Sequence, residues 1–150
     1  MSPAAEPNAI ADNTRSLERL RELVRRLDDR AMERDLGDGW TIGAALAHLA
    51  FWDRVSERRW SAWVKTGDLV DFAGGTDFVN DAAIHQWRAL SPDSVRRLVI
   101  DAAAAVNEAV SSGGAGRVES VVAAGKPRWA HRHLHRVEHI EQIEKAIDRR

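Results

Sequence analysis

The pattern of apolar and polar positions along this chain is helical over most of its length. Apolar residues recur every three or four positions and charged residues fill the positions between them, as on helices that bury one face. This pattern predicts helices over the following approximate ranges: 10–32, 41–65, 76–90, 92–110 and 127–148. The alternation that is typical of a strand occurs only in a short candidate at 118–122. We therefore predict an all-α fold.

Turn and breaker residues divide the predicted helices. Glycines within 35–39 indicate a turn after the first helix, and Gly74-Gly75 breaks the chain before the third. The segment 111–116 is rich in Ser and Gly, so we expect a flexible loop there. Thr41 is suited to cap the second helix. Four main helices and a shorter one predict a helical bundle.

The chain length predicts a single domain. With 150 residues the chain can bury a substantial core. Residues 1–8 are polar and rich in Ala and Pro, and we expect a disordered tail there. The helical bundle then occupies residues 9–150. Either Thr76 or Asp77 could cap its third helix.

Composition restricts the class of protein and of site. The formal net charge is −1 and basic residues are interleaved with acidic ones, so charge alone favours neither nucleic acid nor an anionic membrane as a partner. The chain has no Cys, so a metal would have to be bound by imidazole and carboxylate groups. No run approaches 18 apolar residues and the N-terminus lacks an apolar signal-like segment, so we expect a cytoplasmic protein.

Three histidines lie on faces that the pattern turns toward the interior. His135 and His139 are four residues apart, so their imidazoles project from one face of the last helix, about one turn apart. That face continues with Ile143 and Ala146, which directs both imidazoles into the bundle. His48 lies inside the broad apolar arc of the second helix. Three imidazoles can bind one divalent ion and leave a coordination position open for chemistry.

Each histidine also has a plainer interpretation. An inward-facing histidine is often hydrogen-bonded within a core, and pairs four residues apart arise by chance in a His-rich helix. His131 lies on the same face and could pair with His135 in place of His139. His133 falls on the opposite side of the helix and is expected to be exposed to solvent. His85 is expected to be an ordinary surface or interface residue.

Other residues near these histidines could take part in a site. The chain has six Trp and no Tyr, and core packing explains most of them. Trp52 follows His48 by one turn and could line a pocket above a metal. Glu138 and Gln142 lie beside or along the His face and could orient the imidazoles, or could simply be exposed.

Several motifs resemble one known family. The runs Gly39-Trp40-Thr41-Ile42 and Ala47-His48-Leu49-Ala50-Phe51-Trp52-Asp53 resemble the second-helix signature of the DinB/YfiT-like metalloprotein superfamily. The run His135-Arg136-Val137-Glu138-His139-Ile140-Glu141-Gln142-Ile143 is similar to its last-helix motif. Phe78-Val79-Asn80 and Trp87-Arg88-Ala89-Leu90-Ser91-Pro92 resemble the middle of that family.

The resemblance covers roughly residues 10–147 and implies a fold, a cofactor and relatives. It implies a four-helix bundle with a long crossover. It implies a divalent metal, most often nickel or zinc and sometimes manganese or iron, bound by His48, His135 and His139, and frequently a homodimer. Its relatives include bacillithiol- or mycothiol-dependent S-transferases and mycothiol-dependent maleylpyruvate isomerase, whose extra C-terminal domain does not fit within this chain.

These observations leave several functions open. The first is a metal-dependent enzyme, for example an S-transferase that activates a low-molecular-weight thiol and attacks a small-molecule substrate. A related hypothesis is a metal-dependent hydrolase. The rival is a non-catalytic binding or stress-protection protein, because no carboxylate apart from Glu138 lies on the His face as a general base. A structural helical adaptor is a further alternative. The sequence identifies no catalytic residue beyond the metal ligands.

Overall fold

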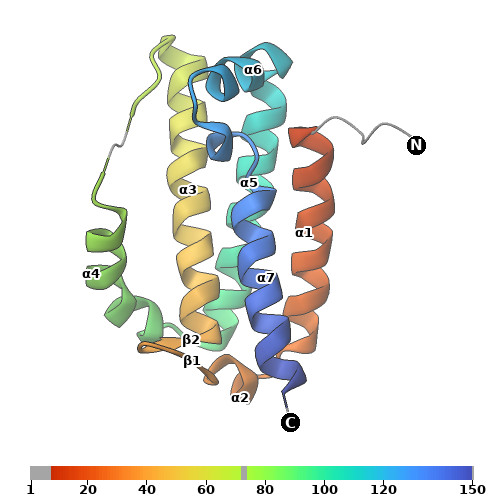
Figure 1. The fold of residues 1–150 in the computed structure, drawn as a ribbon, viewed down its shortest axis with the longest axis vertical. Helices are drawn as coiled ribbons and strands as arrows, with labels where there is room; N and C mark the ends of the chain where they lie inside the picture. Colours follow the sequence, from red (N-terminus) through yellow and green to blue (C-terminus); the bar gives the residue numbers. More distant parts are fainter. Residues whose placement is uncertain (1–7, 72–73, 150) are drawn as a thin grey trace.

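The computed structural model describes residues 8–71 and 74–149 and shows a bundle of helices. Its four long helices lie along the long axis of the molecule (Figure 1): α1 (Ala9–Arg26), α3 (Ile42–Thr66), α5 (Pro92–Gly113) and α7 (His133–Asp148). Helices α1 and α7 run in one direction, and α3 and α5 run in the other. Helix α3 packs against α5 and α7, and α1 packs against the same two helices. The predicted four-helix bundle is confirmed.

A long connection joins the parallel helices α3 and α5. It contains α4 (Thr76–Ala89), which packs against the outside of α3 and returns the chain to the other end of the bundle (Figure 1). Gly67 ends α3 with a left-handed backbone (φ 79°), a conformation that glycine adopts without strain. Gly75 precedes α4 without a capping side chain, so the predicted cap at Thr76 or Asp77 is wrong. This connection is the long crossover that the resemblance implies.

Helix α1 begins at Ala9 and is capped by the residue before it. The disordered tail predicted for 1–8 lies outside the described residues except for Asn8. The side chain of Asn8 accepts a hydrogen bond from the backbone N–H of Ala11 at 3.1 Å and caps α1. This bond satisfies one of the free N–H groups at the start of the helix.

The single helix predicted over about 10–32 is two helices. The backbone of Leu27 is extended (φ −94°, ψ 111°) and ends α1. Asp28 then caps a short helix, α2 (Asp29–Met32), because its carboxylate accepts the backbone N–H of Ala31 at 2.7 Å. The break escapes a periodicity argument because Leu27 stays buried and the apolar spacing continues through it.

Residues 35–41 form a small hairpin where the sequence predicts a turn. Strand β1 (Asp35–Gly37) pairs antiparallel with strand β2 (Trp40–Thr41), with an irregular register. Thr41 then caps α3 as predicted, since its hydroxyl accepts the backbone N–H of Ala44 at 3.1 Å.

Two predictions for the segment after residue 110 are wrong. Residues 111–116 are not a loop, because α5 continues to Gly113 and the chain turns sharply at Gly114 (φ 86°). The candidate strand at 118–122 lies in helix α6 (Ala115–Ala123).

Helix α6 and the segment after it cap one end of the bundle. Val121 is 1% exposed and packs in a small apolar cluster with Trp60 of α3, so burial of one face favours the helix. A 3-10 helix, η1 (Pro127–Trp129), follows. The last helix therefore begins at His133 and not at Pro127.

The core follows the apolar pattern of the long helices. Its fully buried side chains come from all four: Leu20, Ile42, Leu46, Leu49, Val95, Val99, Val106, Ile140 and Ile143. The broad apolar arc predicted for α3 is buried through Trp60, whereas Trp52 and Trp63 are only half-buried.

A buried ionic cluster ties the helices together beside this core. The carboxylate of Asp53 on α3 is 0% exposed and accepts hydrogen bonds from Arg132 Nε at 2.9 Å and Arg136 Nε at 3.2 Å. Arg136 also donates to Ser16 Oγ of α1 at 3.1 Å and to the carbonyl oxygen of Ala103 of α5 at 3.2 Å. One guanidinium group on α7 therefore contacts each of the other three long helices.

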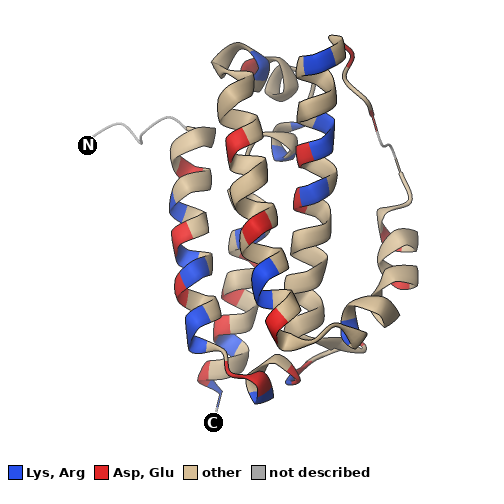
Figure 2. Cartoon of the chain, turned by 180° about the vertical axis from the view of Figure 1, so that it is seen from behind, with Lys and Arg blue, Asp and Glu red and all other residues tan. Residues whose placement is uncertain are grey.

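Charged residues elsewhere lie on the outer faces. Figure 2 shows acidic and basic residues interleaved along α1 and the neighbouring helices. Many of these are exposed pairs such as Arg25–Glu22. Over the ranges that the structure covers, no helix has both the length and the apolar character needed to cross a membrane.

We predict that the buried carboxylate stabilises the fold far more than exposed pairs do. Asp53→Ala leaves two buried guanidinium groups without their partner, which should cost about 3–5 kcal/mol of unfolding free energy. Glu22→Ala removes only an exposed pair and should cost less than about 1 kcal/mol. Urea unfolding followed by circular dichroism measures both. Equal losses in the two variants would contradict the role of Asp53.

Candidate metal centre

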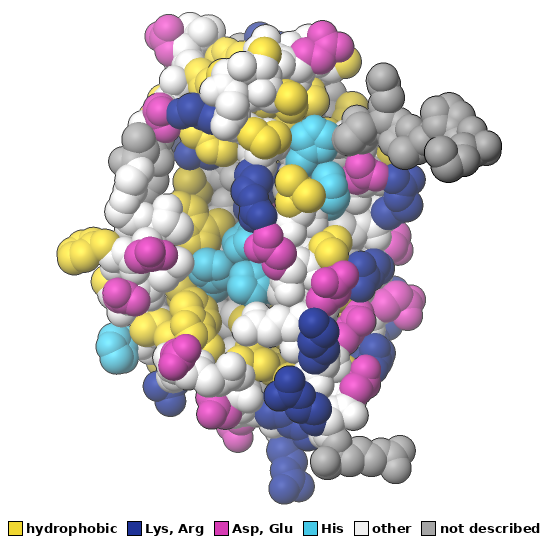
Figure 3. Space-filling model, viewed as in Figure 1, with side chains coloured by type: hydrophobic (Ala, Val, Ile, Leu, Met, Phe, Trp, Pro, Cys, Tyr) yellow, Lys and Arg dark blue, Asp and Glu magenta, His cyan; other side chains and the backbone are white. Residues whose placement is uncertain are grey.

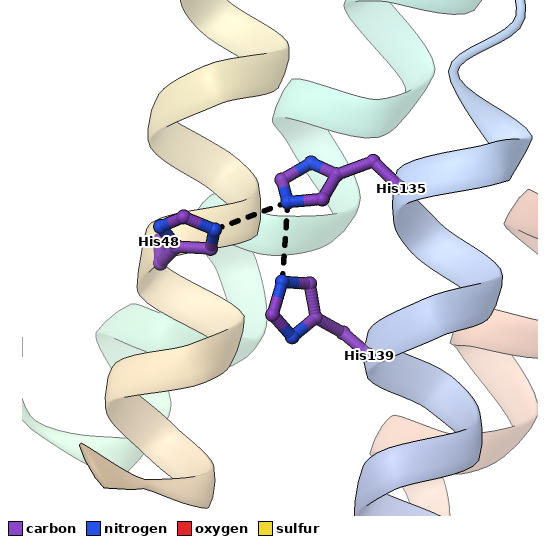
Figure 4. Close-up of side chains that lie close together, drawn as sticks. All are labelled: His48, His135 and His139. Carbon is purple, nitrogen blue, oxygen red and sulfur yellow. Dashed lines mark hydrogen bonds between the residues drawn. The ribbon is translucent and has the colours of Figure 1, made fainter. Parts of the chain in front are cut away.

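Three imidazoles from two helices meet at one point between α3 and α7. Figure 4 shows His48 of α3 facing His135 and His139 of α7. The Nε2 atom of His135 lies 3.0 Å from His48 Nε2 and 3.1 Å from His139 Nε2. The three ring centroids are 4.8 to 5.0 Å apart. We call these three residues the imidazole triad.

The helices determine this arrangement. His135 and His139 are one turn apart on α7 and so share a face. His48 is 7% exposed and projects from the buried side of α3, whereas the other two are half-buried. In Figure 3 a group of histidine side chains is visible at the surface between α3 and α7, with apolar side chains above and below it. A small molecule can therefore reach the triad from this face.

Hydrogen bonds outside the triad orient two of its rings. His48 Nδ1 donates to Asn80 Oδ1 at 3.2 Å, and Trp52 Nε1 donates to the same oxygen at 2.8 Å. Because the indole group can only donate, the shared atom is the amide oxygen. His139 Nδ1 lies 3.2 Å from Gln142 Oε1, which can only accept, so this ring nitrogen donates as well. Both rings therefore carry their proton on Nδ1 and turn the Nε2 lone pair toward the centre of the triad.

The distances inside the triad suit a shared cation. Two nitrogens bound at about 2.05 Å would lie about 3.3 Å apart around a tetrahedral ion and about 2.9 Å apart around an octahedral one. The observed 3.0 and 3.1 Å lie within that range. A single proton on His135 Nε2 would have to serve two lone pairs at once, whereas one divalent ion would satisfy all three nitrogens.

Arg132 adds a second influence on His135. Its Nη2 atom lies 3.4 Å from His135 Nδ1, and its Nε is held by Asp53. A guanidinium group only donates, so this contact favours the tautomer with the proton on Nε2. Binding of an ion would move that proton to Nδ1 and break the contact with Arg132.

The environment keeps the imidazoles neutral, as metal binding requires. Burial lowers the pKa of His48 to about 4, and so do the repulsion that would arise if His139 were also protonated and the positive charge of Arg132. Burial and the neighbouring Arg132 lower the pKa of His135 to about 2. Burial also lowers the pKa of His139.

Aromatic rings surround His48. The rings of Trp40, from the hairpin, and Trp87, from α4, meet it edge to face with centroids 5.3 and 5.4 Å away. Phe51 lies against Trp87 at 5.7 Å. These rings fix the orientation of His48 and provide an apolar wall beside the triad.

Of the other residues singled out in the sequence, the structure places some near the triad and others away from it. Trp52 and Gln142 bond near the triad as described above. Glu138 does not bond to a triad imidazole: it is exposed and pairs with Arg128. The structure brings His139 to His135, and His131 lies elsewhere. The expected exposure of His133 is wrong, because its side chain is only 20% exposed.

Sequence reasoning missed two contributors to the site. Asn80 lies in the crossover helix, far from the His motifs, and only its place in the family-like run Phe78-Val79-Asn80 could have drawn attention to it. Arg132 looks like an ordinary surface charge in a His-rich and Arg-rich run. His85, by contrast, is exposed as predicted.

We predict that protein treated with a chelator loses stability as pH falls below about 6.5. The folded protein holds the pKa values of His48 and His135 well below the 6.5 of the unfolded chain. The stabilisation is therefore complete above pH 6.5 and is lost as the unfolded chain gains protons, at up to about 1.4 kcal/mol per pH unit for each group. Urea unfolding between pH 7.5 and 5 should give a shallower slope for His48→Gln than for His85→Gln. Identical slopes would contradict this origin.

A second prediction concerns Asn80. Asn80→Ala removes the acceptor that holds the proton of His48 on Nδ1, so Zn²⁺ affinity at the triad should fall about 10- to 100-fold. Asn80→Asp retains an acceptor and should keep most of the affinity. Competition with a coloured chelator measures the change. The exposed neighbour Asp81→Ala is the control, and an unchanged affinity in Asn80→Ala would refute this role.

Comparison with known proteins supports the resemblance noted in the sequence. The family model described as the mycothiol maleylpyruvate isomerase N-terminal domain matches residues 13–139, which cover most of the chain and include all three members of the triad. The comparisons with curated proteins and with solved structures returned no match. The chain therefore belongs to the mycothiol maleylpyruvate isomerase N-terminal domain family, within the DinB/YfiT-like superfamily.

Proposed function

We propose that this protein is a divalent-metal-dependent enzyme that activates a low-molecular-weight thiol at the imidazole triad. The observation that carries the proposal is the convergence of three Nε2 atoms, with two rings held by Asn80 and Gln142 in the tautomer that ligation needs. The family match supports it, because the family is described by a thiol-dependent isomerase. Nickel or zinc suits imidazole ligands.

The residues of this chain would have separate roles in such a reaction. A bound divalent ion lowers the pKa of a thiol that ligates it. His48, His135 and His139 would hold that ion and leave the solvent side open to the thiol. Among the residues that the structure describes, no carboxylate is hydrogen-bonded to the triad, so the thiol proton would pass to water. The sulfur would then form a bond to an electrophilic carbon of the second substrate, while the bond from that carbon to its leaving group breaks and the leaving group departs with the electron pair.

A groove along α3 offers a place for that second substrate. Its volume is about 470 Å³. Phe51 and Val55, which line it, follow His48 by three and seven residues and so share its side of α3. Three arginine residues also contribute to the lining of the groove: Arg54, Arg58 and Arg59. We propose that it binds a substrate with an apolar body and an acidic group.

The decisive prediction concerns metal and thiol together. Protein purified without a His tag should turn over an electrophile only with a divalent metal and a thiol, tested with bacillithiol, mycothiol and glutathione. His139→Ala should lose the tightly held ion by elemental analysis and at least about 100-fold of the activity, because two imidazoles remain. His85→Ala, at an exposed histidine, should match the wild type.

Each other outcome decides against the proposal. Thiol-independent ester cleavage would indicate the hydrolase. A tightly bound ion without turnover of any thiol or ester would favour the binding or stress-protection protein. No tightly bound ion and no turnover of any thiol or ester, in the wild type and in His139→Ala alike, would remove the enzymatic hypothesis and favour an adaptor.

A further inference from the structure

A second group of metal-binding side chains lies on the other side of α7. It consists of Asp12 of α1, His131 just before α7 and His133 at its first residue. One ligand atom from each lies within 4.8 Å of the others. The two rings meet edge to face with centroids 5.4 Å apart, and His133 Nε2 lies 4.0 Å from Asp12 Oδ2. We call this the Asp12 cluster.

The Asp12 cluster is separate from the imidazole triad. His133 and His135 are two residues apart on α7, so their side chains point to nearly opposite sides, about 200° apart on the helix. The triad faces α3, whereas His133 faces the start of α1. Figure 3 shows a second group of histidine side chains above the triad, apart from it. The two groups therefore cannot share one ion.

A buried asparagine holds the two segments of the cluster together. Asn13 is 1% exposed. Its Oδ1 accepts the backbone N–H of His133 at 3.0 Å, and its Nδ2 donates to the carbonyl oxygen of Ala130 at 2.8 Å. These bonds fix the backbone on both sides of His131 against α1. The cluster is therefore preorganised by main-chain contacts that do not involve its own side chains.

The cluster has ligand capacity that its hydrogen bonds leave unused. Within residues 8–71 and 74–149, the buried Nδ1 atom of His133 has no hydrogen-bond partner. The 4.0 Å between His133 Nε2 and Asp12 Oδ2 is too long for a hydrogen bond. His131 is 9% exposed. The other Asp12 oxygen pairs with Arg15, whose side chain is 71% exposed and can move away into solvent.

We propose that Asp12, His131 and His133 form a second divalent-cation site, suited to Zn²⁺, Co²⁺ or Ni²⁺. Two imidazoles and a carboxylate are the ligands that these ions accept in a chain without Cys. Ligand atoms around a tetrahedral ion lie about 3.3 Å apart. His133 Nε2 and Asp12 Oδ2 therefore need to approach each other by less than about 1 Å. An ion there joins the first helix to the last. This proposal does not depend on the function of the triad.

The stoichiometry of metal binding tests it. Chelator-treated protein without a His tag is titrated with Zn²⁺ by calorimetry, and bound zinc is measured after gel filtration. We expect two ions per chain for the wild type and for His85→Ala. We expect one for the double variant His131→Ala/His133→Ala and one for His139→Ala. When all three substitutions are combined, binding should disappear.

The results separate this site from the triad. One bound ion per chain in both the wild type and the double variant would overturn the second site and would remain consistent with metal binding at the triad. Two ions in the double variant would also overturn it. If His139→Ala binds as many ions as the wild type, the result would contradict metal binding at the triad and would not affect the second site.

A second readout guards against a folding defect. His133→Gln keeps the backbone N–H that bonds to Asn13, so the helix start should be preserved. In the His139→Ala background Zn²⁺ should raise the melting temperature, and adding His133→Gln should abolish that rise while the circular dichroism spectrum stays the same. An equal rise with and without His133 would refute the site.

Discussion

The buried carboxylate of Asp53 is the constraint on which the site depends. A fully buried charge must be compensated, and both Arg132 and Arg136 turn inward to do so. These arginines are four residues apart, so their shared face fixes the rotation of α7 against α3. His135 and His139 each follow one of them by three residues and therefore lie on the adjoining strip of the same helix. The convergence of the imidazoles is thus a consequence of the buried ionic cluster of Asp53, Arg132 and Arg136, which contains no member of the imidazole triad.

The sequence predicted the long helices because apolar periodicity reports burial of one face, and burial is what holds them in the bundle. It failed where the chain changes direction without a change in that periodicity. Leu27 is buried although its backbone is extended, so the end of α1 leaves no trace in the pattern. Residues 118–122 resemble a strand locally, but Val121 packs against Trp60 of a distant helix. That contact is tertiary and cannot be derived from the neighbouring residues.

The candidate site was predictable to a similar extent. Spacing and family resemblance singled out the three imidazoles, because a shared helical face is a local property. The acceptor of His48 was not predictable, since Asn80 reaches it from the crossover helix 32 residues along the chain. For His133 the helical wheel gave the correct direction and the wrong environment. A helical wheel gives the direction of a side chain, whereas only the fold shows that α1 lies on the side of α7 to which His133 points.

The same buried ionic cluster also affects which ligands the triad can bind. Asp53 contributes one negative charge and its two arginine partners contribute two positive ones, so an excess positive charge lies beside His135. Together with burial, which is the larger cause, that excess lowers the pKa of His135 and keeps the ring neutral, but it also opposes a bare divalent cation. An anionic ligand in the open coordination position would relieve this repulsion, whereas a neutral one would not. At the proposed metal centre a thiolate or a hydroxide would therefore be favoured over an uncharged thiol or water, so the charge of this cluster would help to select the reactive form of the proposed thiol substrate.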